Sequence, residues 1–170
     1  MTALTRTEPS STPTAPDRAD SIRFCSWCGE LSEQPRRPLH VPHRVCDSCE
    51  MGVLLSCRRD ALSGDAAAFL ICTYELTVSA VSEAGERIFG AQDRLAGAHL
   101  LDLATCPLGD EQLARHAALA AQRARELVVV PMRLRSDEGA ALGTLAARIA
   151  TCGPPRAALV TVEPTGFGRR

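Results

Sequence analysis

Two pairs of closely spaced cysteines constrain this chain more than any other feature. Two residues separate Cys25 from Cys28, two separate Cys46 from Cys49, and seventeen residues lie between the pairs. A tight turn lets both sulfurs of a pair reach one ion, and two pairs complete the tetrahedral four-thiolate shell that zinc accepts. The spacing therefore predicts a structural site for one zinc ion per chain.

The segment between the pairs, Gly29–Val45, holds three prolines and only four apolar side chains, so we expect the metal to hold it together. Two alternatives stay open for the ligands. The same four thiolates could bind iron as in rubredoxin, although the chain offers no redox partner domain. His40 or His43 could replace a cysteine, although four better-spaced thiolates favour zinc and leave the histidines in a solvent-exposed loop.

The cysteine spacing resembles that of treble-clef and GATA-type fingers, in which the second pair stands at the start of a helix. By this resemblance a helix is expected from Ser48 to about Leu62. Met51, Leu54 and Leu55 would form its apolar side at roughly helical spacing.

Charge favours a protein partner over nucleic acid for this finger. Between Ser21 and Asp60 there are six arginines and five acidic residues, and a zinc tetrathiolate adds about two negative charges. A finger that reads DNA usually presents a basic face, so partner docking or structural stapling is preferred, with DNA as the second choice. Contacts with a nucleic acid or a partner are expected at two arginine pairs: Arg36, Arg37, Arg58 and Arg59.

The chain has eight cysteines, and the other four have no chelating neighbour in sequence. Cys72 and Cys152 lie in apolar segments and are expected in the core. Cys57 and Cys106 are expected to be exposed thiols. They raise the hypothesis of a redox switch in which oxidation ejects the zinc.

Composition outside the finger indicates a cytoplasmic bacterial protein. Residues 1–20 are rich in Thr, Ser, Pro and Ala and lack an apolar stretch, so we expect a disordered leader rather than a secretory signal. No apolar run approaches the roughly 18–20 residues of a membrane span. All 19 basic residues are arginine, a bias typical of a GC-rich bacterial genome.

The pattern changes after the finger, which we place at 21–62, and predicts a second domain over 64–165 with a tail at 166–170. The expected strands are 68–74, 76–81, 126–135, 141–151 and 156–163. The expected helices are 83–89, 93–95, 99–104 and 110–125. This order predicts an α+β domain with an antiparallel sheet and helices on one face.

Residues 69–90, FLICTYELTVSAVSEAGERIFG, are followed by Leu-Ala-Gly at 95–97 and Leu-Leu-Asp-Leu at 100–103. Together they resemble a PAS domain, in which a hairpin leads into a helix ending in Phe-Gly, then Leu-x-Gly and Leu-x-Asp-Leu elements, a long helix and three returning strands. The resemblance covers about 67–164. It implies a five-stranded sheet and a role in sensing or dimerisation without catalysis. Ser82-Glu83 departs from the Asn that many members place after the second strand.

No motif assigns a ligand or a reaction to the PAS-like domain. The Asn-Cys-Arg core of flavin-binding members is absent, and His116 alone, on the expected long helix, is a weak argument for haem. The chain also lacks a Gly-x-Ser-x-Gly elbow, a phosphate loop and a His-Glu-x-x-His motif. We therefore expect no enzyme but a signal-transduction module, a sensor or homodimerisation domain whose finger docks a partner protein. The alternative is a transcription regulator whose finger binds DNA under control of the PAS-like domain.

Overall fold

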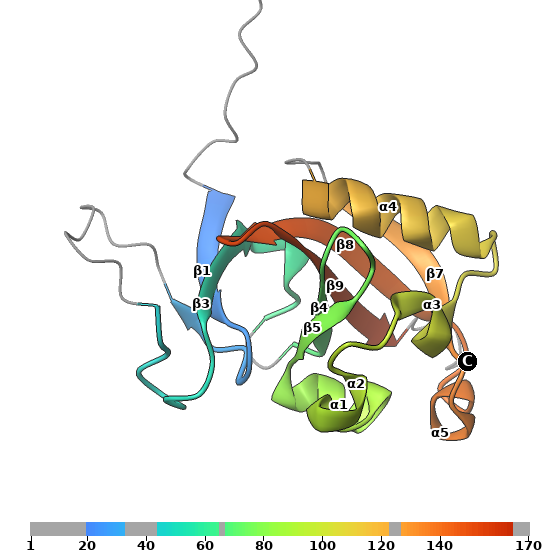
Figure 1. Cartoon of the computed structure of the whole chain (residues 1–170), viewed down its shortest axis with the longest axis horizontal. Helices are drawn as coiled ribbons and strands as arrows, with labels where there is room; N and C mark the ends of the chain where they lie inside the picture. Colours follow the sequence, from blue (N-terminus) through green and yellow to red (C-terminus); the bar gives the residue numbers. More distant parts are fainter. Residues whose placement is uncertain (1–19, 33–43, 65–66, 123–126, 165–170) are drawn as a thin grey trace, which may run out of the picture.

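Antiparallel strand pairing organises the part of the chain that the structure describes. The computed structural model describes residues 20–32, 44–64, 67–122 and 127–164, which form an α+β fold with a curled antiparallel sheet and few helices (Figure 1). The strands are β1 (Ser21–Cys25), β2 (Leu31–Ser32), β3 (Leu54–Arg58), β4 (Phe69–Cys72), β5 (Val78–Val81), β6 (Ala104–Thr105), β7 (Val128–Leu134), β8 (Leu145–Gly153) and β9 (Ala157–Pro164). The helices are α1 (Glu83–Phe89), α2 (Gln92–Leu95), α3 (Leu100–Leu103), α4 (Asp110–Gln122) and α5 (Asp137–Ala140).

The larger part of the chain follows the expected order of elements. The β4–β5 hairpin leads into α1, α2 and α3, then into the long helix α4, and β7, β8 and β9 return. In the sheet β4 lies between β5 and β9, so the first and last strands of this part are neighbours. Helix α1 has the predicted bounds because the Ser82 hydroxyl accepts a hydrogen bond from Gly85 N–H at its start. The α+β fold class is thus confirmed.

A large hydrophobic core lies between one face of the sheet and the helices. Alternate residues of the strands point into it, among them Leu70 of β4, Met132 of β7 and Val160 of β9, all fully buried. Helix α4 contributes Leu113 and a row of alanines, and it lies along the sheet in Figure 1. Alanines bring the helix close to the strands, because they add little side-chain bulk at the contact.

The N-terminal strands join this sheet and do not form a separate one. β1 pairs with β2 and β3, and β3 pairs with the end of β8 through Cys57 opposite Cys152. The rest of the same edge of β8, from Leu145 to Ile149, pairs with β7. The sheet therefore has nine strands, more than the five expected, because the N-terminal strands and the short β6 extend it.

A second core lies on the face of the sheet that the helices leave open. It contains Phe24 of β1, Leu55 of β3, and Phe69 and Ile71 of β4. The alternate residues of β4 point into the first core. The rings of Phe24 and Phe69 meet edge to face, with their centroids 5.3 Å apart. The N-terminal strands are thus packed on the main sheet as well as hydrogen-bonded to it.

The helix expected from Ser48 to Leu62 is wrong. Val53 forms a bridge with Val45, and β3 follows directly and ends in a 3-10 turn at Arg59–Ala61. Met51, expected on the apolar side of the helix, is 67% exposed. In β3 burial alternates with the two-residue period of a strand. Pairing with β1 and β8, both distant in sequence, overrides the apolar spacing that suggested a helix.

Membrane-spanning character was also tested on the helices. Among the described residues, no helix has both the length and the apolar composition needed to cross a bilayer.

Candidate metal centre

The two cysteine pairs lie in two similar turns, here called the first knuckle (25–30) and the second knuckle (46–52). In the first, Gly29 N–H donates to Cys25 C=O at 3.2 Å, and in the second, Glu50 N–H donates to Cys46 C=O at 2.9 Å. Each turn is closed at its base, by Cys25 N–H to Glu30 C=O and by Cys46 N–H to Gly52 C=O. The same pattern of backbone hydrogen bonds thus positions both cysteine pairs.

Hydrogen bonds also hold the two knuckles against each other. Ser26 N–H donates to Val53 C=O at 2.9 Å, and Val53 N–H donates to the Ser26 hydroxyl at 2.9 Å. β1 carries the first knuckle and β3 follows the second, so the β1–β3 ladder places the two turns side by side. Strand pairing thus brings together two cysteine pairs that are separated by seventeen residues in the chain.

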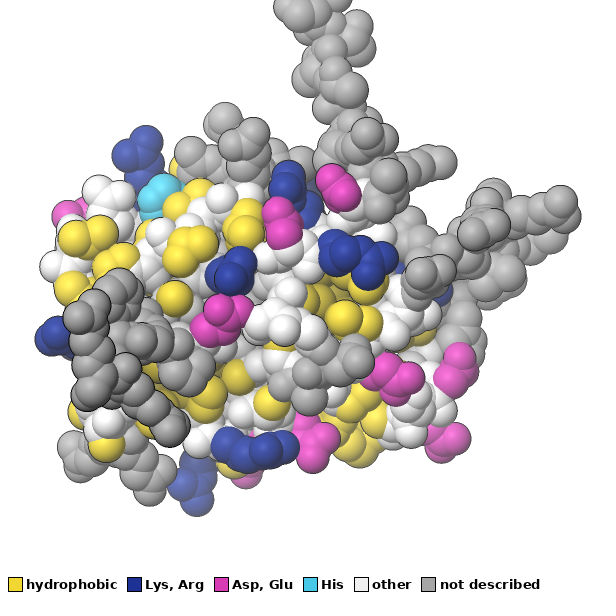
Figure 2. All heavy atoms as spheres, turned by 180° about the vertical axis from the view of Figure 1, so that it is seen from behind, with side chains coloured by type: hydrophobic (Ala, Val, Ile, Leu, Met, Phe, Trp, Pro, Cys, Tyr) yellow, Lys and Arg dark blue, Asp and Glu magenta, His cyan; other side chains and the backbone are white. Residues whose placement is uncertain are grey.

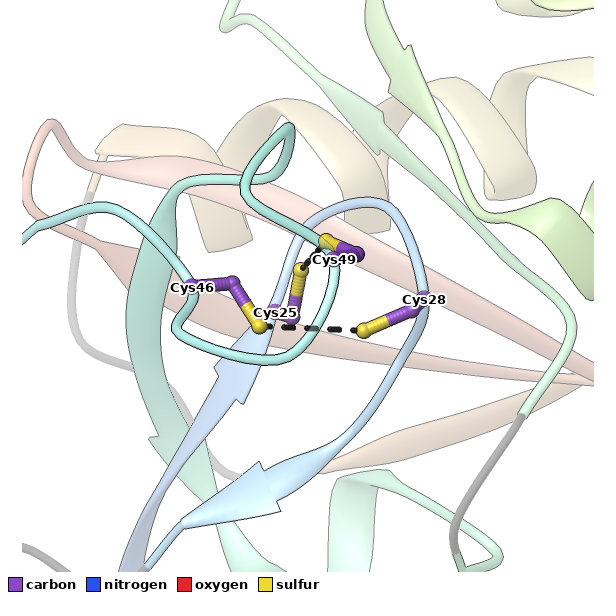
Figure 3. A group of neighbouring side chains, drawn as sticks. All are labelled: Cys25, Cys28, Cys46 and Cys49. Atoms are coloured by element: carbon purple, nitrogen blue, oxygen red, sulfur yellow. Dashed lines mark hydrogen bonds between the residues drawn. The ribbon is translucent and has the colours of Figure 1, made fainter.

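The four sulfurs converge on one point between the knuckles (Figure 3). Their ligand atoms all lie within 4.8 Å of one another. Cys25 Sγ is 3.6 Å from Cys49 Sγ, and Cys28 Sγ is 3.8 Å from Cys46 Sγ. A tetrahedral ion with metal–sulfur bonds of about 2.3 Å sets its sulfurs about 3.8 Å apart. The four cysteines predicted from the sequence could therefore hold one metal ion.

Backbone N–H groups point at two of these sulfurs. Trp27 N–H donates to Cys25 Sγ at 3.4 Å, and Gly52 N–H donates to Cys49 Sγ at 3.4 Å. Such donors stabilise a thiolate, and the N–H groups of Met51 and Gly52 lower the pKa of Cys49 to about 6. The knuckles therefore supply partial positive charge where a metal-bound thiolate would need it.

Burial acts in the opposite direction on the first pair. Loss of solvent raises the pKa of Cys25, and it raises the pKa of Cys28 to about 12, with the neighbouring sulfurs adding to the effect. A metal ion binds thiolates, so its binding must release the protons of such thiols. A cation between the knuckles would stabilise the deprotonated thiolates. The distances between the sulfurs also fit such an ion.

Gly52 has no room for a side chain. A Cβ at this position would overlap Cys25 Sγ and would come within 3.0 Å of Trp27. The residue before Met51, Glu50, has a positive φ of 56°, which an acidic residue adopts only in a turn. The sequence offered no signal for this requirement, because Gly52 follows the second pair and was expected inside a helix.

The remaining cysteines all lie in the interior. Cys72 and Cys152 are buried, as predicted, but Cys57 and Cys106, expected to be exposed, are only 5% and 4% exposed. Cys57 points into the second core because it alternates with partly buried positions of β3, and Cys106 belongs to the first core. Burial raises the pKa of Cys57, Cys72 and Cys152 to about 12, which makes them poor nucleophiles at neutral pH.

The structure describes two of the four arginines that were predicted to contact a nucleic acid or a partner. Arg58 forms a two-pronged ion pair with Asp60, with distances of 3.0 and 2.7 Å, and Arg59 is exposed in the 3-10 turn that follows. Arg36 and Arg37 lie outside the described residues, as do His40, His43 and all but the last residue of the expected leader. The two arginines that are described lie at the far end of β3 from the second knuckle.

The chain was also compared with known proteins. No protein-family profile matches it, and no curated protein is significantly similar. The chemistry of the cysteine site thus rests on its own geometry.

Proposed function

We propose that the protein is a non-catalytic signalling module, in which a structural zinc ion holds an N-terminal docking element on a PAS-like sensory domain. The observation that carries this proposal is the convergence of four cysteine sulfurs within 4.8 Å in a segment whose strand β3 is part of the main sheet. A metal at this place would fix the shape of the knuckles and not perform a reaction.

Zinc fits the ligand set best among common ions. Two knuckles that each supply two thiolates form a closed tetrahedral shell, whereas a catalytic zinc keeps one position open for water or substrate. The two hairpin-like turns are closer to a zinc ribbon than to a treble clef, because a strand follows the second pair. Iron in the same shell is the competing assignment.

The PAS-like assignment is supported by the order and pairing of elements. A hairpin, three short helices, one long helix and three returning strands follow one another as in the quoted motifs. The pairing of β4 with both β5 and β9 is a further consistent feature. A sensory or dimerisation role follows from that resemblance, and the ligand of the domain stays open.

Protein docking is a better use of the finger than DNA binding. Of the two described arginines in the predicted contact set, Arg58 is already paired with Asp60. The transcription-regulator alternative requires DNA affinity that falls steeply with salt. It would be supported by such binding to wild-type protein and its loss on neutralising Arg36, Arg37, Arg58 and Arg59.

Native mass spectrometry of the reduced full chain tests the proposal directly. We expect one zinc per chain, and cobalt(II) in its place should give the visible absorption of a tetrahedral tetrathiolate. A chain purified with iron and showing reversible redox absorption would contradict the zinc assignment. The same spectra report the oligomeric state and any retained small molecule, which would identify a ligand of the PAS-like domain.

A further inference from the structure

An apolar groove opens between the two knuckles and the main sheet. Its volume is about 460 Å³, within the range of about 300–1,000 Å³ typical of binding pockets. Trp27, Met51 and Val53 line one side, and Ile71 of β4 and Ala80 of β5 lie opposite. The groove therefore lies where the N-terminal strands stop covering the outer face of the sheet.

Large apolar side chains are exposed around this groove. Met51 is 67% exposed and Val53 is 43% exposed, and both belong to the groove wall. Val45, which pairs with Val53, is 49% exposed. Three of the seven exposed large hydrophobic residues in the described chain thus fall within nine positions. A cluster of exposed apolar side chains often marks an interaction surface.

The segments next to the lining residues Trp27 and Met51 carry negative charge. The two knuckles contain three exposed acids, Glu30, Asp47 and Glu50, and no basic residue, although Arg44 precedes the second. Glu83, which starts α1, is exposed and donates its backbone N–H to Trp27 C=O at 2.8 Å. At the right of Figure 2, the end that carries the knuckles, apolar side chains lie beside several acidic ones.

Two further observations make the groove more favourable to cations. Its wall residues Trp27 and Gly52 donate N–H groups to the sulfurs of the metal site, so a tetrathiolate charge of about −2 would lie directly behind the wall. Arg156, beside the lining residues Pro155 and Ala157, points away, because its guanidinium donates to Gln122 C=O at 2.9 Å.

We propose that this groove docks a segment of a partner protein that presents apolar side chains flanked by arginine or lysine. The inference deepens the proposed function and rests on it for the metal-held shape of the knuckles. An apolar side chain enters the groove between Met51 and Ile71. The flanking cations meet the carboxylates of Glu50 and Glu83, which also gives the interaction its specificity.

Fluorescence anisotropy with three labelled peptides tests the partner chemistry on the full metal-bound chain. The probe alternates leucine with arginine, the second peptide has glutamate for arginine, and the third has serine for leucine. We expect the probe to bind and both controls to bind at least about tenfold more weakly. Equal binding of the glutamate peptide would overturn the charge argument, and equal binding of the serine peptide would overturn the apolar one.

A matched pair of variants places the binding in the groove. Met51→Arg puts a cation at the groove, and Leu108→Arg makes the same change at a site between β6 and α4 that is also 67% exposed. We expect Met51→Arg to weaken the probe by about tenfold or more and Leu108→Arg to leave it unchanged. An equal loss in both variants would contradict docking at this site.

Metal stoichiometry separates this inference from the proposed function. A chain with one zinc that binds no probe overturns the docking inference and leaves the function standing. A chain that holds no metal overturns the function itself. Sedimentation of the same samples tests whether a second copy of the chain occupies the groove instead. Self-association of a chain that does not bind the probe, lost in Met51→Arg, would assign the groove to a second copy. A small molecule displaced by Met51→Arg in native mass spectra would assign it to a ligand instead.

Discussion

The knuckle end and the helix-covered sheet are stabilised by different means. The knuckles bring four sulfurs together but leave Met51 and Val53 exposed, so little apolar area is buried there. The core between the sheet and the helices buries side chains such as Leu113 and Met132 completely. Hydrophobic burial therefore stabilises the second region, whereas the first has a cysteine cluster that could hold a metal ion.

The boundary between the two regions runs through the N-terminal strands. β1 ends at the first knuckle and β3 begins after the second, yet they bury Phe24 and Leu55 in the second core. Metal dependence should therefore fade along these strands, from the cysteines toward the pairing of Cys57 with Cys152. We expect such a gradient if the knuckles act as the proposed docking element and must keep a fixed orientation on the proposed sensory domain.

The largest expected effect comes from Cys46→Ser. Loss of one ligand removes most of the binding free energy of a structural zinc, about 10 kcal/mol or more in small fingers. Hydrogen exchange should therefore accelerate strongly in both knuckles and remain slow in β4, β8 and β9.

Cys72→Ser is the matched control for this prediction, because the same chemical change falls in the helix-side core, where Cys72 is fully buried. It should lower the free energy of unfolding by about 1–3 kcal/mol and leave the metal bound. Unchanged exchange in the knuckles of Cys46→Ser would show that the metal does not hold them.

The second prediction concerns the packing that joins the regions. Phe24→Ala removes the ring that meets Phe69 edge to face and should cost about 3–5 kcal/mol. Trp27, the single tryptophan, reports the knuckle end by fluorescence, and far-ultraviolet circular dichroism reports the sheet. In wild-type protein the two urea transitions should coincide, whereas in Phe24→Ala the fluorescence transition should come first. Phe89→Ala, in the other core, should keep them together.

The sequence predicted the helix-side region well, for local reasons. A glycine directly after Phe89 closes α1, which has the predicted bounds Glu83–Phe89, and alternating or continuous apolar residues define β4, β5 and β9. The four cysteines were equally visible, because their spacing alone describes a metal shell. These signals each lie within a few residues of the element that they predict.

The sequence failed where structure depends on distant pairing. Leu54 and Leu55 suit a helix or a strand equally, and only the ladders to β1 and β8 decide for β3. Cys57 was therefore expected at the surface, although strand geometry turns it into the second core. The groove was unpredictable for the same reason, since Met51 and Ile71 line it together although they are distant in sequence.

The third prediction separates metal binding from folding. Gly52→Ala places a methyl group on Cys25 Sγ and should weaken the metal by about 10–100-fold, as other changes beside metal ligands do. Competition with a chromophoric zinc chelator measures this affinity. Gly64→Ala is the control, because a Cβ there meets nothing within 4 Å although φ is +126°. Because of the strain at this φ, it should lower the free energy of unfolding by about 1–2 kcal/mol and leave metal affinity unchanged. An equal loss of affinity in both would point to a general folding defect.

The smallest expected effect belongs to the helix-side region. The fully buried Ser82 hydroxyl accepts from Phe69 N–H at 3.1 Å and from Gly85 N–H at 3.0 Å, and donates to Ala67 C=O at 2.9 Å. Ser82→Ala should cost about 2 kcal/mol, because it removes a cap and leaves Phe69 N–H unpaired. Ser136→Ala, an exposed cap with one bond to Gly139 N–H, should cost about 1 kcal/mol or less.

Metal titration of these two serine variants decides whether the regions are independent. Since neither hydroxyl touches a knuckle, both variants should bind zinc with wild-type affinity. One direct link between the two regions is the hydrogen bond from Glu83 N–H, beside Ser82, to Trp27 C=O. Weaker zinc binding in Ser82→Ala, with unchanged binding in Ser136→Ala, would show that the start of α1 helps to position the first knuckle. That bond would then connect the proposed sensory domain to the proposed docking surface.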